Sequence, residues 1–206
     1  MQHGQVDKKF KDSMLVAALI TGIAAVHYYY MRDQWAEGLG SPTELRYVDW
    51  ILTVPLMVVE FALLTGVGMA KLFWLSVVML VTGYFGESGV TGVLDAQSWG
   101  AISGIAYFIM AYEVGCLRVF SDGAPSGAVG DALANAKGKI PAAGKMLQWF
   151  VLVGWAIYPL GYMMGTDGWY SGAVSGLGLD MDIVYNVGDA INKIGFGMAV
   201  WSAARD

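Results

Sequence analysis

Long apolar segments recur along the chain and are separated by short polar breaks. Each apolar segment has about the 17 to 25 residues that a helix needs to cross a hydrocarbon layer of about 30 Å. Six such segments lie at about 13–31, 46–67, 70–86, 99–118, 146–165 and 182–203. The breaks at 38–43, 86–89, 121–139 and 165–172 are rich in Gly, Ser, Ala or Pro and predict loops. The pattern therefore predicts an all-α transmembrane bundle of six spans, forming one domain over residues 1–206.

Composition supports a chain solvated by the lipid bilayer. Of the 206 residues 56% are hydrophobic and only 14% are charged, and the mean hydropathy is +0.52, which is too apolar for a soluble domain of this length. Seventeen acids outnumber twelve bases and no basic run occurs, so nucleic acid is excluded as a partner. The single cysteine, Cys116, excludes an internal disulfide, no zinc-like spacing indicates a metal site, and the polar first thirteen residues predict no cleaved signal peptide.

The basic residues predict the orientation in the membrane, because lysine and arginine gather on the cytoplasmic side. Nine bases fall on alternate connections that share one side: Lys8, Lys9, Lys11, Lys71, Arg118, Lys137, Lys139, Lys145 and Arg205. On the opposite side only Arg32 lies in a loop. We therefore expect both ends of this chain, including its C-terminus, to face the cytoplasm.

The two remaining bases, Arg46 and Lys193, lie in or at the end of apolar segments, where an unpaired charge is costly and indicates a functional site. Lys193 follows Asp189 by four residues, so the two share one helix face and can pair. A purely structural ion pair between helices is the alternative.

The second apolar segment carries a polar stripe. Arg46, Asp49, Thr53 and Glu60 are separated by three, four and seven residues and so share one face. Asp49 and Glu60 are about 16 Å apart by helical rise, with Glu60 toward the inner side. Two carboxylates at different depths, with a lysine between them, suit a proton relay, and apolar neighbours favour a neutral Glu60 that can donate a proton. Alternatively, Glu60 is a polar residue hydrogen-bonded across helices.

Aromatic residues surround these charges. His27 lies in an aromatic stretch, where it is either a packing residue or a partner that tunes Asp49 through a hydrogen bond. Trp155 and Tyr158 share one face of the fifth segment, beside Pro159, which predicts a kink. Together with Trp50 these residues either simply pack or form the walls of a flat pocket for a conjugated ligand.

Four motifs, RYVDWILTVPL, GWAIYP, HYYYMR and DAINKIGFG, resemble the microbial rhodopsins, specifically the proteorhodopsin and xanthorhodopsin group of bacterial light-driven proton pumps. The similarity runs from about Lys8 to the end of the chain. It implies a light-driven ion transporter rather than an enzyme, located in the bacterial plasma (inner) membrane as a multi-pass protein.

The resemblance also implies roles for the charged residues. Lys193 would hold all-trans retinal as a protonated Schiff base, with Asp49 as counterion and proton acceptor and Asp189 as second counterion. Arg46 would shape the outer-side field, His27 would hydrogen-bond to Asp49, and Thr53 would stabilise the region beside the Schiff base. Glu60 would be the cytoplasmic proton donor. The set Asp49, Thr53 and Glu60 matches the family's proton-pump pattern, whereas its sodium pumps carry Asn, Asp and Gln at these places.

The same resemblance places the retinal against Trp50, Trp155, Tyr158 and Pro159. Met57 occupies the position similar to the family's colour-tuning site, where an apolar side chain implies green absorption. Gly100 matches a glycine that in xanthorhodopsin-like members opens a lateral window for a carotenoid antenna; close helix packing is the alternative reason for a glycine there.

The chain departs from the family in one respect. Its first apolar segment resembles the family's second helix, so we expect the family's first helix to be absent from this sequence or supplied by another polypeptide. The resemblance further implies a homo-oligomer, a pentamer or hexamer. Two other functions stay open: a retinal-binding photosensor that signals through a partner, and a six-helix scaffold or transporter without retinal.

Overall fold

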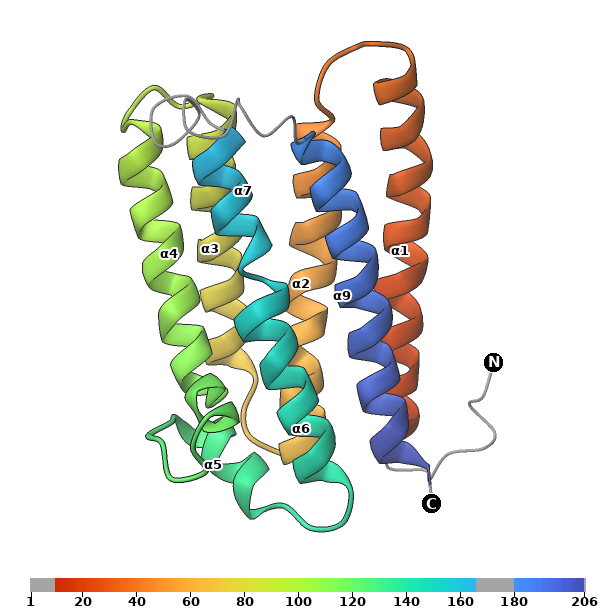
Figure 1. Ribbon diagram of the computed structural model, residues 1–206, viewed down its shortest axis with the longest axis vertical. Helices are drawn as coiled ribbons and strands as arrows, with labels where there is room; N and C mark the ends of the chain where they lie inside the picture. The colour runs from red at the N-terminus through yellow and green to blue at the C-terminus, as the bar shows by residue number, and fades with distance from the viewer. Residues whose placement is uncertain (1–9, 166–179, 206) are drawn as a thin grey trace.

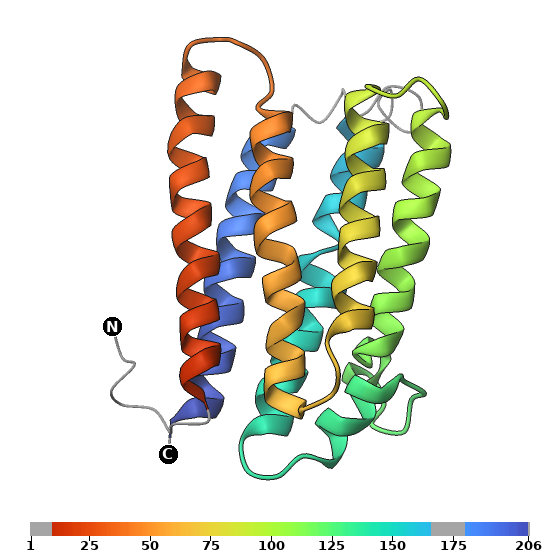
Figure 2. The same cartoon turned by 180° about the vertical axis from the view of Figure 1, so that it is seen from behind.

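Five of the six expected spans each coincide with one helix in the computed structural model, which describes residues 10–165 and 180–205. The span expected at 146–165 coincides with three consecutive helical segments. Helices α1 to α4 follow in order and run side by side, and a fifth rod is formed by α6, the π-helical turn η4 and α7 (Figures 1 and 2). Helix α9 is the sixth. Their bounds are α1 Lys11–Ala36, α2 Thr43–Thr65, α3 Ala70–Ser88, α4 Ala96–Glu113, α6 Ile140–Trp149, η4 Phe150–Gly154, α7 Ile157–Gly165 and α9 Met181–Ala204. The predicted all-α bundle is confirmed.

The outer surface of the bundle is apolar, as a lipid-facing surface must be. Side chains such as Phe108, Trp74 and Ile191 are 70%, 63% and 61% exposed, far more apolar surface than a soluble monomer presents. By length and composition three stretches could cross a membrane: Lys11–Ala36, Thr43–Thr65 and Ile140–Met164. The other helices of the bundle are shorter or carry more polar residues.

Helix α2 is the best buried element and carries the polar stripe into the protein. Arg46, Asp49, Thr53 and Glu60 are all at most 2% exposed. The helix runs between α1 and α3 (Figure 2), and Gly66 ends it in a left-handed conformation with φ of 73°. The predicted stripe therefore faces the interior along its whole length.

The prediction of a loop over 121–139 is wrong in part. Residues Ala128–Asn135 form the helix α5, which lies across one end of the bundle (Figure 1). Val129 and Leu133, four residues apart, are buried on one face of this helix, and Gly130 packs closely against Gly115 and Ser126. A short Gly- and Ala-rich helix gives no long apolar signal, so only its packing against the bundle stabilises it. The predicted loop at 165–172 lies outside the described residues beyond Gly165.

The basic residues gather at the end of the bundle where α5 lies. Lys71 is the second residue of α3, Arg118 follows α4, and Arg205 follows α9. Lys139 directly precedes α6 and Lys145 lies within it, so these described bases share one end of the bundle (Figure 1). Arg32 and Arg46 lie toward the opposite end. The predicted placement of the basic residues on alternate connections at one end of the bundle therefore holds for the described part of the chain.

Candidate functional site

A buried ammonium group lies between two carboxylates at the centre of the bundle. Lys193 of α9 is 2% exposed, and its Nζ contacts the carboxylate of Asp49 on α2 and lies 2.6 Å from Oδ2 of Asp189. The pairing predicted from the four-residue spacing of Asp189 and Lys193 is thus present, and the stripe on α2 supplies the second acid. A buried group of one positive and two negative charges can hold an additional proton.

Two tyrosines hold Asp189 in place. The hydroxyl of Tyr158 on α7 donates to Oδ1 at 2.7 Å, and the hydroxyl of Tyr28 on α1 donates to Oδ2. Both carboxylate oxygens of Asp189 are therefore engaged. By contrast, Asp49 has its Oδ1 buried with no hydrogen-bond donor among the described residues.

The expected hydrogen bond between His27 and Asp49 is not formed. His27 Nδ1 lies 3.8 Å from Asp49 Oδ1 and 2.9 Å from the carbonyl oxygen of Ile23, four residues earlier in the same helix. The imidazole thus neighbours the acid but turns one nitrogen to its own backbone. The Thr53 hydroxyl likewise donates to a backbone carbonyl, that of Asp49, at 2.9 Å, which fixes the side chain beside the lysine cluster.

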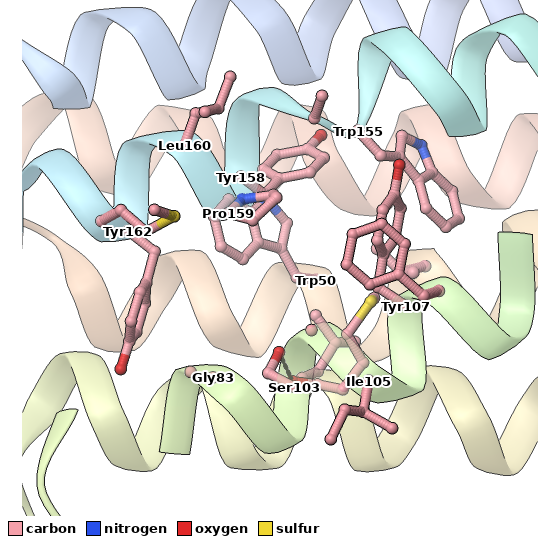
Figure 3. A pocket seen from close by; sticks show the side chains of 18 of the residues that line it. Trp50, Gly83, Ser103, Ile105, Tyr107, Trp155, Tyr158, Pro159, Leu160 and Tyr162 are labelled. Carbon is pink, nitrogen blue, oxygen red and sulfur yellow. Dashed lines mark hydrogen bonds between the residues drawn. The ribbon is translucent and has the colours of Figure 1, made fainter. Parts of the chain in front are cut away.

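An apolar cavity of about 550 Å³ adjoins this cluster between α2, α3, α4 and α7 (Figure 3). Trp50, Trp155, Tyr158, Pro159 and Gly100, all predicted from the sequence, line it. The rings of Trp50 and Tyr158 meet edge to face with centroids 4.8 Å apart. Since Trp50 follows Asp49 and Tyr158 binds Asp189, the ionic cluster lies directly behind this wall. Lys193 and Met57 do not line the cavity; Met57 is buried elsewhere in the core, 1% exposed.

Gly100 serves close packing in this structure. The Tyr162 ring of α7 inserts between α3 and α4, and its hydroxyl donates to the Ala96 carbonyl at 2.5 Å. A Cβ added at Gly100 would lie 2.7 Å from the Tyr162 ring, and one added at Gly86 would lie 1.9 Å from its hydroxyl. The two glycines therefore create the space that Tyr162 fills at the edge of the cavity.

Glu60 is isolated from the lysine cluster. Its side chain is fully buried among Phe61, Val58 and other apolar groups, and it interacts with the Ser13 side chain on α1. Neither carboxylate oxygen has a hydrogen bond of normal geometry within the described part of the chain. A carboxyl in such surroundings is suited to carry a proton rather than a charge.

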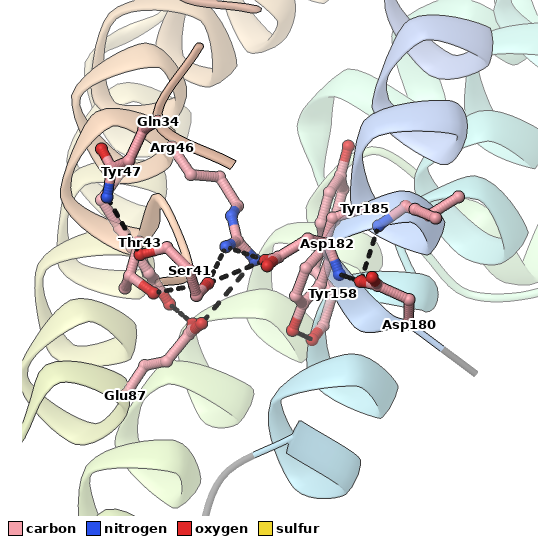
Figure 4. Close-up of polar contacts among 11 residues, drawn as sticks. Gln34, Ser41, Thr43, Arg46, Tyr47, Glu87, Tyr158, Asp180, Asp182 and Tyr185 are labelled. Atoms are coloured by element: carbon pink, nitrogen blue, oxygen red, sulfur yellow. Dashed lines mark hydrogen bonds and ion pairs between the residues drawn. The ribbon is translucent and has the colours of Figure 1, made fainter. Parts of the chain in front are cut away.

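A second charged cluster lies toward the N-terminal end of α2 (Figure 4). Arg46 pairs with Asp182 at 2.6 Å and lies 3.8 Å from Glu87, which also accepts a hydrogen bond from Tyr47 at 2.8 Å. The guanidinium stacks over the Tyr185 ring at 4.5 Å. Arg46 is therefore neutralised by Asp182 and Glu87 and does not reach Asp49.

The residues present fit a retinal chromophore. A conjugated polyene needs a flat apolar cavity and, for a covalent link, a primary amine; aromatic walls supply the first and Lys193 the second. The free Oδ1 of Asp49 offers an acceptor to a protonated nitrogen at Lys193. The groups that would hold retinal are thus Lys193, Trp50, Trp155, Tyr158 and Pro159.

Comparison with known proteins agrees with this geometry. The family model described as "Bacteriorhodopsin-like protein" matches residues 1–206. The chain belongs to the bacteriorhodopsin-like family. Green-light absorbing proteorhodopsin from Gamma-proteobacterium EBAC31A08 is 37% identical over 99% of this chain and 78% of its own length. Blue-light absorbing proteorhodopsin from Gamma-proteobacterium Hot 75m4 is 38% identical over the same shares.

Solved structures of bacteriorhodopsin-like proteins share the fold. Blue light-absorbing proteorhodopsin from Med12 superposes with a TM-score of 0.75 at 36% identity, over 98% of this chain and 87% of that one. Exiguobacterium sibiricum rhodopsin gives 0.76 at 31% identity, over 98% and 86%. Xanthorhodopsin, described as a light-driven ion pump with dual chromophore, gives 0.73 at 26%, over 98% and 83%.

Sequence reasoning missed several polar partners in this bacteriorhodopsin-like protein. The Tyr28 hydroxyl donates to Asp189, and Asp182 pairs with Arg46. The Asn192 amide donates to the Gly154 carbonyl. Asp182 precedes Asp189 by seven residues, two helical turns, so it shares that face of α9 and could have been found by spacing. Tyr28 and Asn192 neighbour His27 and Lys193 in sequence, but their partners lie on other helices.

Proposed function

We propose that this protein is a light-driven outward proton pump that binds all-trans retinal covalently on Lys193. The observation that carries the proposal is the placement of Lys193 between Asp49 and Asp189, with a separate buried acid, Glu60, about 16 Å further along α2. When bound, retinal supplies light absorption and a change of shape at the Lys193 nitrogen.

Asp49 is the proton acceptor of this proposal. Both oxygens of Asp189 accept hydrogen bonds from tyrosine hydroxyls, and these bonds stabilise the ionised form. Asp49 contacts the same ammonium group through Oδ2, and its buried Oδ1 accepts no hydrogen bond among the described residues. A proton leaving Lys193 Nζ therefore goes to Asp49, while Asp189 stays charged and keeps the lysine in place.

Glu60 returns the proton from the inner side. It lies on the same face of α2 but is too far from Lys193 to act as its counterion, and its apolar surroundings keep it protonated until the acceptor has been filled. On the other side, Arg46 with Asp182 and Glu87 supplies polar groups through which a proton leaves Asp49. Transfer is outward because the acceptor Asp49 lies nearer the outer side and the donor Glu60 lies nearer the inner side.

The proposal is tested in cells or right-side-out vesicles supplied with all-trans retinal. Illumination should acidify the outer medium, and a protonophore should abolish the pH change. The same acidification should persist when sodium is replaced by potassium and chloride by sulfate. Alkalinisation, or a signal that follows sodium or chloride, would reject outward proton pumping.

We propose that the end of the bundle carrying α5 and the C-terminal end of α9 faces the cytoplasm of a bacterium, as the gathering of lysines and arginines there supports.

A homo-oligomer, a pentamer or hexamer, is proposed on family analogy; the mass of the protein in lipid nanodiscs tests it. A groove between α1 and α9, lined by small side chains such as Ala17, Ala18 and Gly197, supports a further membrane helix as a partner.

A carotenoid antenna beside Gly100 is the remaining proposal for ligands. The glycine and the cavity wall support it, but Tyr162 fills the space next to Gly100, so a carotenoid ring must displace or stack on this tyrosine. Energy transfer from added carotenoid, seen in the excitation spectrum, tests the idea.

A further inference from the structure

The π-helical turn η4 interrupts the fifth rod between α6 and α7 and changes the hydrogen bonds of its backbone. The Trp155 N–H bonds to the Phe150 carbonyl at 2.9 Å, five residues back, rather than to Val151. The Ala156 N–H turns to Val153 at 3.2 Å, and the Tyr158 N–H turns to Trp155 at 3.1 Å, because Pro159 has no N–H to bond there. The carbonyls of Val151, Leu152 and Gly154 thereby lose their regular helical donors.

Side chains from two other helices satisfy these carbonyls. From α4, the Tyr107 hydroxyl donates to Val151 at 2.9 Å and approaches Leu152 at 3.3 Å. From α9, the Asn192 amide donates to Gly154 at 2.9 Å. The turn that carries Trp155 and leads to Tyr158 is therefore held from opposite sides by neighbouring helices.

Asn192 is the more informative of the two donors, since it directly precedes Lys193. Its amide also lies 3.4 Å from the Tyr158 hydroxyl, which donates to Asp189. A side chain at position 154 would have to displace the Asn192 amide, because an added Cβ would lie 2.0 Å from Asn192 Oδ1. The Asn192 amide thus links α9, which carries Lys193, to Gly154 in the π-helical turn and to Tyr158, which donates to Asp189.

We propose that Asn192 is a positioning residue that anchors the π-helical turn to α9 and transmits changes at Lys193 and Asp189 to this turn between α6 and α7. The transmission rests on the proposed function, whereas the anchoring does not. A shift of α9 or of Tyr158 alters the Asn192 to Gly154 contact, and Gly154 is one end of the turn. Tyr107 holds the opposite side of the turn and acts as its fixed point.

Amide hydrogen exchange tests the anchoring in the retinal-free protein in detergent. Asn192→Leu keeps a similar volume but removes the donor, leaving the buried Gly154 carbonyl unpaired. Exchange at residues 155–158 should then be about five to a hundred times faster, the factor expected for an unpaired buried carbonyl. Asn135→Leu removes an amide bond of similar length, to the Asp131 carbonyl at 2.8 Å on the exposed face of α5, and is the control. It should leave 155–158 unchanged.

A second measurement tests the transmission in the retinal-loaded protein. Illumination should raise exchange at 150–158 in the unaltered chain, and this difference between light and dark should fall at least threefold in Asn192→Leu. Asn192→Ala, a smaller change, repeats both tests if the leucine variant does not fold.

Three results would overturn the proposal. Exchange at 155–158 equal to that of the control variant would reject the anchoring. An unaltered chain whose exchange does not respond to light, or a light response kept in full by Asn192→Leu, would reject the transmission. If the chain binds no retinal, the proposed function fails, but the retinal-free exchange still decides the anchoring.

Discussion

Replacing Glu60 with glutamine removes one titratable proton from a fully buried site and changes little else. Glutamine has nearly the same shape, and neither oxygen of Glu60 has a normal hydrogen bond to lose among the described residues. We expect the variant to fold, to bind retinal and to keep its absorption maximum. The helical rise from Glu60 to Asp49, the acid that contacts Lys193, is about 16 Å. At a separation of about that size, even a full charge on Glu60 would interact with the lysine by only about 1 kcal/mol at an effective dielectric constant of 20.

The consequence should appear late in the photocycle. Loading of Asp49 should proceed normally, but return of a proton to Lys193 should slow by about 100- to 10,000-fold, the usual contribution of a positioned acid. The return should also become slower as the pH rises, since protons then arrive directly from the inner solution. Flash spectroscopy at several pH values measures both effects, and azide, a small diffusible acid, should restore the rate.

Glu113→Gln is the matched control for this experiment. Glu113 is another buried acid, at the α5 end of the bundle, but it is paired with Lys71 at 2.5 Å and accepts the Ala128 N–H at 3.1 Å. We expect this variant to keep the normal rate of proton return. A large shift of the absorption maximum in Glu60→Gln with an unchanged rate would show that Glu60 lies beside the chromophore and would refute the assignment of inner and outer ends. A cycle of many seconds that is independent of Glu60 would favour a photosensor.

Four further predictions follow from single sites. Lys193→Ala should stay colourless with retinal, because Lys193 is the only buried lysine among the described residues; hydroxylamine-sensitive visible absorption would contradict this. Asp49→Asn should shift absorption to the red and stop light-driven acidification, because the counterion and acceptor is lost; unchanged pumping would exclude Asp49 as acceptor. Gly100→Trp should displace Tyr162 and lower stability by about 1–3 kcal/mol, seen in thermal denaturation, and should prevent energy transfer from carotenoid. The Ser98 N–H donates to Asp95 at the start of α4 and lowers the pKa of this carboxyl, so its stabilising effect should be present at neutral pH and be lost as the pH falls through that lowered pKa. Asp95→Ala should therefore lower the thermal midpoint at pH 7 more than at pH 3, and an equal loss at both would contradict the reasoning.

The sequence by itself determined the helices and the residues that share a face. Hydrophobic length predicted all six spans, because a segment in lipid must satisfy its backbone internally and so becomes a helix. Helical spacing placed Arg46, Asp49, Thr53 and Glu60 on one buried stripe and Asp189 beside Lys193, since a spacing of three or four residues depends only on helix geometry. The eight-residue helix α5 has no long apolar run and escaped this reasoning.

Only the tertiary structure decided which groups meet across helices. Tyr28 donates to Asp189, Arg46 pairs with Asp182, and His27 bonds to the Ile23 carbonyl while lying 3.8 Å from Asp49. Helical spacing shows which residues share a face but not which of these pairs form across helices. The π-helical turn likewise exists where Tyr107 and Asn192 supply donors to freed carbonyls. Such contacts depend on the rotation and depth of whole helices, which are set by the packing of many side chains at once rather than by any local pattern.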